Sequence, residues 1–228
     1  MTTITARLQA VKARIEAAAL AAGRRPSDVG LLAVSKSFSD KDIMEAYRAG
    51  QQVFGENFVQ EGVEKVACLA GLSIEWSFIG PVQSNKTRLV AENFDWVHSV
   101  DRLKIAERLA HARPESRPPL QICIQVNVSQ EASKSGVAPD ETLVLSQKVA
   151  GLSGLSLRGL MAIPEPTSDV ASQRRQFRML REIRDEIVRH GIVLDTLSMG
   201  MSDDLEAAIA EGSTLVRVGR AIFGPRSV

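Results

Sequence analysis

The stretch that decides the fold is LSMGMSDDLEAAIAEGSTLVRVG, residues 197–219. One apolar run covers Leu194–Met199, a segment of helical spacing covers Asp203–Glu211, and a second apolar run covers Leu215–Gly219. Two short apolar runs that flank one helical segment are typical of a β-α-β unit.

The same alternation extends toward the N-terminus. Several of the runs are apolar at consecutive positions, as expected for strands that are buried on both faces of a parallel sheet. The eight candidate strands are Gly30–Lys36, Gln52–Gly55, Glu75–Gly80, Trp96–Val100, Leu120–Val128, Leu155–Ile163, Leu194–Met199 and Leu215–Gly219.

Helical segments separate these runs. A first amphipathic helix places Ile4, Leu8, Val11, Ile15 and Ala19 at three- or four-residue spacing, after threonines that can cap it. The later candidates are Lys41–Arg48, Val59–Ala70, Arg102–Ala110, Glu141–Val149, Phe177–Arg189 and Asp203–Glu211.

Eight strands that alternate with helices in 228 residues predict an α/β fold, a single (β/α)8 TIM barrel with an extra N-terminal helix. No linker rich in Pro, Gly or Ser divides residues 1–228, so we expect one domain. A doubly wound open sheet is the alternative, and periodicity does not separate the two.

Composition limits the possible functions. Lys plus Arg is 28 and Asp plus Glu is 27, so the net charge of +1 provides no global field that would attract nucleic acid or an acidic membrane. Two cysteines without C-x-x-C spacing and three scattered histidines do not predict a metal site. No apolar run has the length of a signal peptide core or a membrane span, so we expect a soluble, cytoplasmic protein.

Candidate chemistry lies where strands finish, because TIM barrels build their sites at the C-terminal mouth. Lys36 closes the first strand, and partial desolvation there would lower its pKa and free the amine to attack an aldehyde. A lysine that extends to solvent from the strand end is the alternative, and it is the more common situation for one lysine taken alone.

The last strand carries Arg217 and runs into Gly219, where backbone amides and the start of a short helix favour phosphate. A buried arginine needs a ligand or partner to offset its desolvation. Two interpretations are equally open: Arg217 hydrogen-bonds a ring nitrogen, or it forms an ion pair with a carboxylate such as Asp195 or Glu206.

Other polar residues follow strand ends. Ser198 and Ser202 offer hydroxyl and backbone donors, although Ser202 could instead cap the helix that begins at Asp203. Asn57 follows the second strand and could contact a ring substituent, or serve only as a turn residue. Lys134, in the polar loop after the fifth strand, is a minor candidate for a second anion site.

Six sequence blocks resemble the pyridoxal 5′-phosphate (PLP) homeostasis protein family. They occur in the family's order and extend over nearly the whole chain. The blocks are AVSK (33–36), FGEN (54–57), WSFIGPVQSNK (76–86), QVNVSQEASKSG (125–136), RGLMAIP (158–164) and LSMGMSDDLEAAIAEGSTLVRVGRAIFGPR (197–226).

This resemblance implies a barrel like the N-terminal domain of bacterial alanine racemase, with PLP held as a Schiff base on Lys36. It implies that Arg217 faces the pyridine nitrogen, and that Asn57 lies near the ring. It places Ser198, Gly219 and Arg220 around the phosphate, with Ser202 close by.

Two residues depart from the family pattern. Ser77 stands where a histidine is common, and Arg220 stands where a threonine is frequent. The arginine could strengthen phosphate binding by its charge, or project away and leave only its backbone amide. Neither change removes Lys36.

The resemblance implies a non-catalytic, monomeric carrier that stores PLP or delivers it to PLP-dependent apoenzymes. A racemase needs a second acid/base group, and the only tyrosine, Tyr47, is expected on a helix outside the barrel. A weak amino-acid racemase is the alternative. A third possibility is a barrel enzyme in which Lys36 forms a Schiff base with a phosphorylated metabolite.

Overall fold

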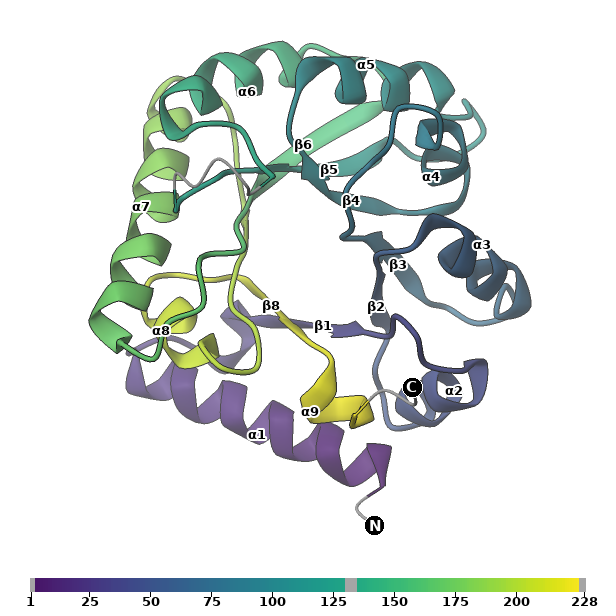
Figure 1. Ribbon diagram of the computed structural model, residues 1–228, viewed down its shortest axis with the longest axis vertical. Coiled ribbons are helices and arrows are strands. Elements are labelled where there is room, and N and C mark those ends of the chain that lie inside the picture. Colours follow the sequence, from purple (N-terminus) through teal and green to yellow (C-terminus); the bar gives the residue numbers. More distant parts are fainter. Residues whose placement is uncertain (1–2, 130–134, 226–228) are drawn as a thin grey trace.

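Eight parallel strands close into a barrel in the computed structural model, which describes residues 3–129 and 135–225. Each strand pairs with its neighbour in sequence, and β8 returns to pair with β1, as Figure 1 shows. The strands are β1 Gly30–Val34, β2 Val53–Glu56, β3 Glu75–Phe78, β4 Trp96–Val100, β5 Leu120–Gln125, β6 Leu155–Met161, β7 Thr196–Ser198 and β8 Leu215–Val218. The predicted TIM barrel is confirmed, and the alternative of an open sheet is wrong.

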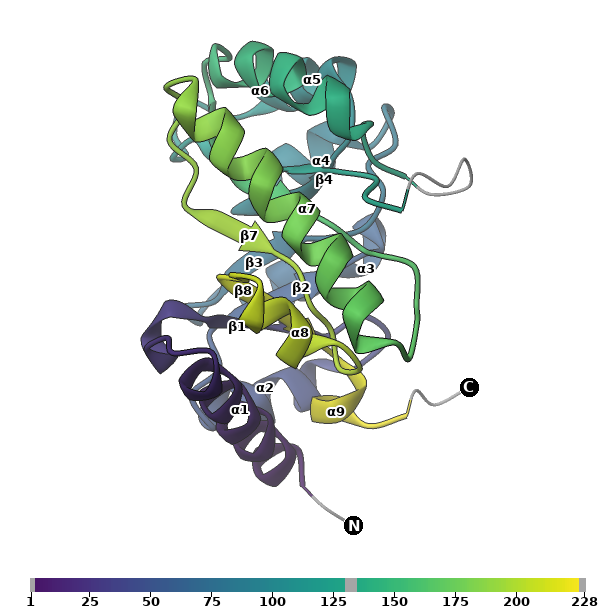
Figure 2. The ribbon, with the colours of Figure 1, turned by 90° about the vertical axis from the view of Figure 1, so that its left-hand side faces the viewer.

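Helices surround the barrel (Figures 1 and 2). Two short 3-10 turns, η1 Pro26–Asp28 and η2 Pro139–Glu141, accompany them. The α-helices are α1 Ile4–Ala21, α2 Asp40–Arg48, α3 Val59–Cys68, α4 Thr87–Asn93, α5 Leu103–Ala112, α6 Thr142–Ala150, α7 Val170–Arg189, α8 Leu205–Ala210 and α9 Arg220–Phe223.

Two helices differ from the prediction. The helix α4 was not predicted, because its seven residues are too few to show an apolar period, although it buries Val90 and Ala91. The helix α7 begins at Val170 rather than at Phe177. Its first two turns are polar, and the signal that starts it is a cap: the Asp169 carboxylate accepts hydrogen bonds from the Ala171 and Ser172 amides.

The extra N-terminal helix is present, and it packs across the segment where the barrel closes. The Thr3 hydroxyl caps α1 by accepting from the Ala6 amide. Arg14 of α1 forms an ion pair with Glu206 of α8, while Arg7 donates to the carbonyl oxygens of Ile222 and Phe223 at α9. The helix therefore fixes the elements that flank β8, as Figure 2 shows.

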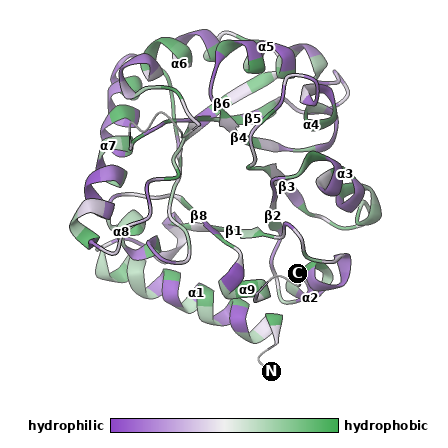
Figure 3. Cartoon of the chain, viewed as in Figure 1, coloured by the Kyte–Doolittle hydropathy of each residue, from purple (hydrophilic) through white to green (hydrophobic). Residues whose placement is uncertain are grey.

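Hydrophobic residues concentrate along the strands, and the surrounding helices alternate hydrophilic with hydrophobic residues (Figure 3). The buried core includes Phe54, Phe78, Phe94 and Phe177. Within residues 3–129 and 135–225, no helix combines the length and the apolar character that crossing a membrane requires.

Candidate functional site at the C-terminal mouth

The carboxyl ends of neighbouring strands place Lys36, Asn57 and Gly219 at one mouth of the barrel. In the parallel register Val34 lies opposite Gly55, and Ala33 lies opposite Val218. Lys36 lies two residues after Val34, and Asn57 lies two residues after Gly55. Gly219 directly follows the last residue of β8. The strand register therefore brings together three of the residues that the sequence predicted.

Arg217 lies inside the barrel just below this mouth and is 4% exposed. Its Nη1 donates to the carbonyl oxygen and to Oγ of Ser198, the latter at 2.7 Å, and its Nη2 donates to the Ala162 carbonyl oxygen at 2.8 Å. These bonds use three of the five N–H hydrogens of a guanidinium, which leaves donors for a ligand.

The alternative of an ion pair between Arg217 and Asp195 or Glu206 is wrong. Asp195 pairs with Arg158, and Glu206 pairs with Arg14. Burial lowers the pKa of Arg217 to about 10, against the opposing influence of Asp204, so the guanidinium remains charged at neutral pH. Neutral oxygen atoms solvate this charge, and the interior of the mouth therefore favours a ligand with a hydrogen-bond acceptor.

His98, one of the three scattered histidines, extends the Arg217 contacts. Its Nδ1 lies 2.8 Å from Oγ of Ser198, and its side chain is fully buried. The Ser198 hydroxyl oxygen therefore contacts both the Arg217 guanidinium and the imidazole. Burial, and then the charge of Arg217, lower the pKa of His98 to about 3, so the imidazole is neutral.

One sequence signal could have revealed His98. Alternate residues of a strand face the same side, and a histidine in a short strand of a predicted barrel has an even chance of pointing inward. His98 Nε2 and Ser77 Oγ are two of the four buried side-chain atoms without a hydrogen-bond partner among the described residues. Both residues line a cavity of about 340 Å³ at the opposite mouth of the barrel.

Asn57 offers an acceptor for which the described part of the chain provides no donor. Its Oδ1 is buried and unpartnered, although the residue as a whole is half-buried. Gly80 permits this placement, because a Cβ atom there would lie 2.2 Å from the Asn57 carbonyl oxygen. A buried acceptor without a donor is costly, so Asn57 fits a position against a ligand.

The segment after β8 presents backbone amides. Gly219 is the N-cap of α9, and the first N–H groups of a helix have no partner within the helix. A Cβ atom at Gly219 would lie 3.2 Å from the Val34 carbonyl oxygen, so a larger residue would crowd the end of β1. The Arg220 side chain is exposed.

Ser202 does not cap α8. The N-cap of that helix is Asp204, whose Oδ1 accepts from the Met201 amide, and the Ser202 carbonyl oxygen accepts from Arg14. The capping interpretation of Ser202 is therefore wrong. Ser202 is half-buried and lies in the segment between β7 and α8.

The remaining candidates lie elsewhere. Tyr47 is on α2, outside the strands, as expected. Lys134 lies outside the described residues. The described part of the chain contains no group of three His, Cys, Asp or Glu side chains that could hold a metal ion.

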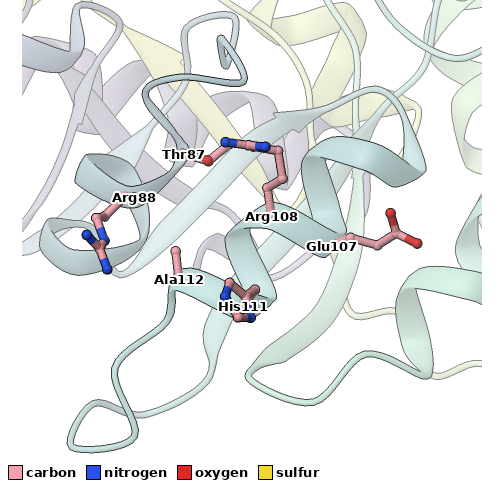
Figure 4. Close-up of a pocket in the computed structure, with 6 residues that line it drawn as sticks. All are labelled: Thr87, Arg88, Glu107, Arg108, His111 and Ala112. Atoms are coloured by element: carbon pink, nitrogen blue, oxygen red, sulfur yellow. The ribbon is translucent and has the colours of Figure 1, made fainter.

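A separate cavity of about 470 Å³ opens on the outer face of the barrel between α4 and α5 (Figure 4). It is lined by Thr87, Arg88, Glu107, Arg108, His111 and Ala112. None of the predicted site residues belongs to it.

Comparison with known proteins agrees with this geometry. Residues 6–227 match the family model of the alanine racemase N-terminal domain. The chain is 58% identical over 226 residues to the pyridoxal phosphate homeostasis protein of Pseudomonas aeruginosa, covering 99% of this chain and 97% of that protein.

Solved structures extend the comparison. PipY of Synechococcus elongatus, solved with PLP bound, is 36% identical with a TM-score of 0.85, covering 97% of this chain and 100% of that one. Alanine racemase of Corynebacterium glutamicum is 17% identical with a TM-score of 0.70, covering 96% of this chain and 62% of that one, which shows a common fold.

The depressed pKa of His98 predicts a specific loss of stability in acid. Its folded pKa of about 3 lies below the ordinary value of 6.5, so between these values the unfolded state binds more protons. His98 therefore lowers the free energy of unfolding by about 2 kcal/mol between about pH 7 and about pH 5. Urea unfolding of His98→Asn should show a shallower pH dependence than wild type.

The exposed His111 provides the matched control, because His111→Asn should keep the wild-type slope. Equal slopes for wild type and His98→Asn would contradict the assignment of a neutral, buried imidazole.

Proposed function

Because this chain belongs to the family of pyridoxal phosphate homeostasis proteins, we propose that it binds PLP at the C-terminal mouth of the barrel, through a Schiff base on Lys36, and takes part in PLP homeostasis. The observation that carries the site is the buried Arg217. It is charged, it is held by Ser198 and Ala162, and these bonds leave other guanidinium N–H groups for a ligand.

The residues at the mouth fit PLP. When bound, PLP supplies an aldehyde that condenses with an amine, an aromatic ring with a nitrogen acceptor, and a phosphate. Lys36 provides the amine, Arg217 donates to the ring nitrogen, and the unpartnered Oδ1 of Asn57 accepts from a ring substituent. The amides after Gly219, with Ser202 nearby, bind the phosphate.

Ser198 and Arg220 take modified roles in this proposal. The Ser198 hydroxyl already bonds to His98 and Arg217, so we assign it to holding the guanidinium rather than to the phosphate. The exposed Arg220 contributes its backbone amide at the start of α9, and its side chain adds positive charge at the rim.

We infer that the protein is a carrier rather than a racemase. An arginine beside the pyridine nitrogen disfavours protonation there, which weakens the ring as an electron sink. A racemase also needs acid/base groups on both faces of the bound amino acid. Tyr47 cannot serve from α2 on the outside of the barrel.

We further propose that the protein acts in the cytoplasm as a monomer and delivers PLP to PLP-dependent apoenzymes. Its two cysteines support the compartment: Cys68 is exposed, Cys123 is buried, and both are free thiols, as a reducing environment maintains.

Covalent labelling tests the site. Addition of PLP should give a visible absorption band in wild type, and borohydride reduction followed by peptide mass spectrometry should find the label on Lys36. Lys36→Ala should lose the band and at least about 90% of the label. Lys41→Ala, which removes an exposed lysine on α2, is the matched control and should behave as wild type. A label that persists in Lys36→Ala would refute the assignment.

Chiral analysis tests the inference of a carrier. The protein loaded with PLP and incubated with L-alanine should form D-alanine no faster than the same concentration of free PLP, measured by chiral chromatography. The reason is that no second acid/base group is proposed at the mouth. Protein-dependent conversion of L-alanine to D-alanine would show that the protein is a racemase.

A further inference from the structure

A buried ionic network lies behind the end of β1. We call it the Lys65 network, and its members are Ser35, Ser37, Glu56, Glu61 and Lys65. Lys65 of α3 is 5% exposed, and its Nζ donates to Oε1 of Glu56 at 2.9 Å and to Oε1 of Glu61 at 2.5 Å. It also donates to the Ser35 carbonyl oxygen at 2.8 Å.

The Lys65 network contacts the backbone on both sides of Lys36. On one side, the Ser35 carbonyl accepts from Lys65, and the Ser35 hydroxyl donates to Oε1 of Glu56 at 2.6 Å. On the other side, the Ser37 amide donates to Oε1 of Glu61 at 2.5 Å. Lys36 therefore lies between Ser35 and Ser37, and the backbone of each of these serines is hydrogen-bonded to a side chain of α3.

The turn at Ser37 needs this support. Its φ of 64° is the only positive φ at a non-glycine residue in the described part of the chain. A serine in the left-handed region is disfavoured, and such a conformation persists where surrounding contacts impose it. The Phe38 amide closes this turn by donating to the Ser35 carbonyl oxygen at 3.0 Å. The bond from the Ser37 amide to Glu61 adds a contact that holds the turn from α3.

The network also joins two strand ends. Glu56 is the last residue of β2, is fully buried, and directly precedes Asn57. Burial raises the pKa of Glu56, while Lys65 and the Ser35 hydroxyl oppose that shift. Through Glu56, the same ammonium group that holds Ser35 also fixes the segment that presents Asn57.

Packing alone does not account for the charges. Removing a lysine and a glutamate from water costs free energy that apolar side chains of similar volume would avoid. Buried ionic groups of this kind can instead select one backbone conformation over others. The conformation that this network contacts is the turn that carries Lys36 at the end of β1.

We propose that Glu61 and Lys65 are positioning residues for Lys36, and that they act through the Ser37 amide and the Ser35 carbonyl to aim its amine at the PLP aldehyde. This inference rests on the proposed function, because it takes Lys36 as the site of attachment. In the proposed complex, Arg217 binds the ring and the amides after Gly219 bind the phosphate. A displacement of the Lys36 amine relative to these groups would therefore make its encounter with the aldehyde less frequent.

The test compares Glu61→Ala with Glu61→Gln, because only the glutamine keeps an oxygen that accepts from the Ser37 amide. The Glu61 side chain is 28% exposed, so its removal is less disruptive than removal of Lys65. Glu64→Ala, on an exposed position of the same helix, is the matched control. Circular dichroism verifies that each variant is folded.

Two measurements are made on each protein. Stopped-flow absorbance gives the rate constant for covalent attachment of PLP, and hydrogen exchange mass spectrometry without PLP reports on the amides of residues 35–39. Glu61→Ala should slow attachment by about tenfold or more and speed exchange in this segment. Glu61→Gln should restore both within about twofold, and Glu64→Ala should match wild type.

The outcomes separate this inference from the proposed function. Attachment at the wild-type rate in Glu61→Ala would overturn the positioning role and leave Lys36 as the site. Slow attachment in both Glu61 variants would also overturn it, because charge rather than the bond to Ser37 would then matter. Absence of label on Lys36 in wild type would remove the proposed function and this inference together.

Discussion

The pairing of β8 with β1 is the contact on which the rest of the structure depends. Four residue pairs in parallel register, from Gly30 with Leu215 to Ala33 with Val218, turn eight strands into a closed barrel. The same register brings Lys36, near the start of the chain, beside Gly219 at its end. The helix α1 reinforces this closure, because its arginines bind the elements on either side of β8.

Closure also creates an unusual interior. TIM barrels fill their centre mainly with branched apolar side chains. This barrel instead contains Arg217, Ser198, His98 and Ser77. Arg217 is bonded to Ser198, and Ser198 to His98, so the charge at the mouth is supported by a column of neutral polar groups. A charge supported in this way stays available to a ligand, whereas an ion pair would neutralise it.

Much of this architecture could be predicted from the sequence. All eight strands could be located because buried parallel strands are apolar at consecutive positions, and Lys36, Asn57 and Gly219 could be placed because strand ends share a mouth. The partners of Arg217 could not be predicted, since they depend on how the end of β7 and the residue after β6 are placed at its level.

The Lys65 network could not be predicted for a different reason. A lysine in VQEGVEKVAC follows a glutamate by four residues, a spacing that is typical of a solvent-exposed helix face. Only the packing of α3 against the end of β1 buries it. The turn at Ser37 was equally hidden, because a positive φ at serine has no sequence signal comparable to glycine.

We propose that the C-terminal mouth binds PLP between Lys36 and Arg217, and a crystal structure of the protein with PLP is the decisive test. We expect continuous density from Nζ of Lys36 to the cofactor, with the ring nitrogen within hydrogen-bond distance of Arg217. Density that joins PLP to another lysine, or a ring nitrogen facing away from Arg217, would contradict it.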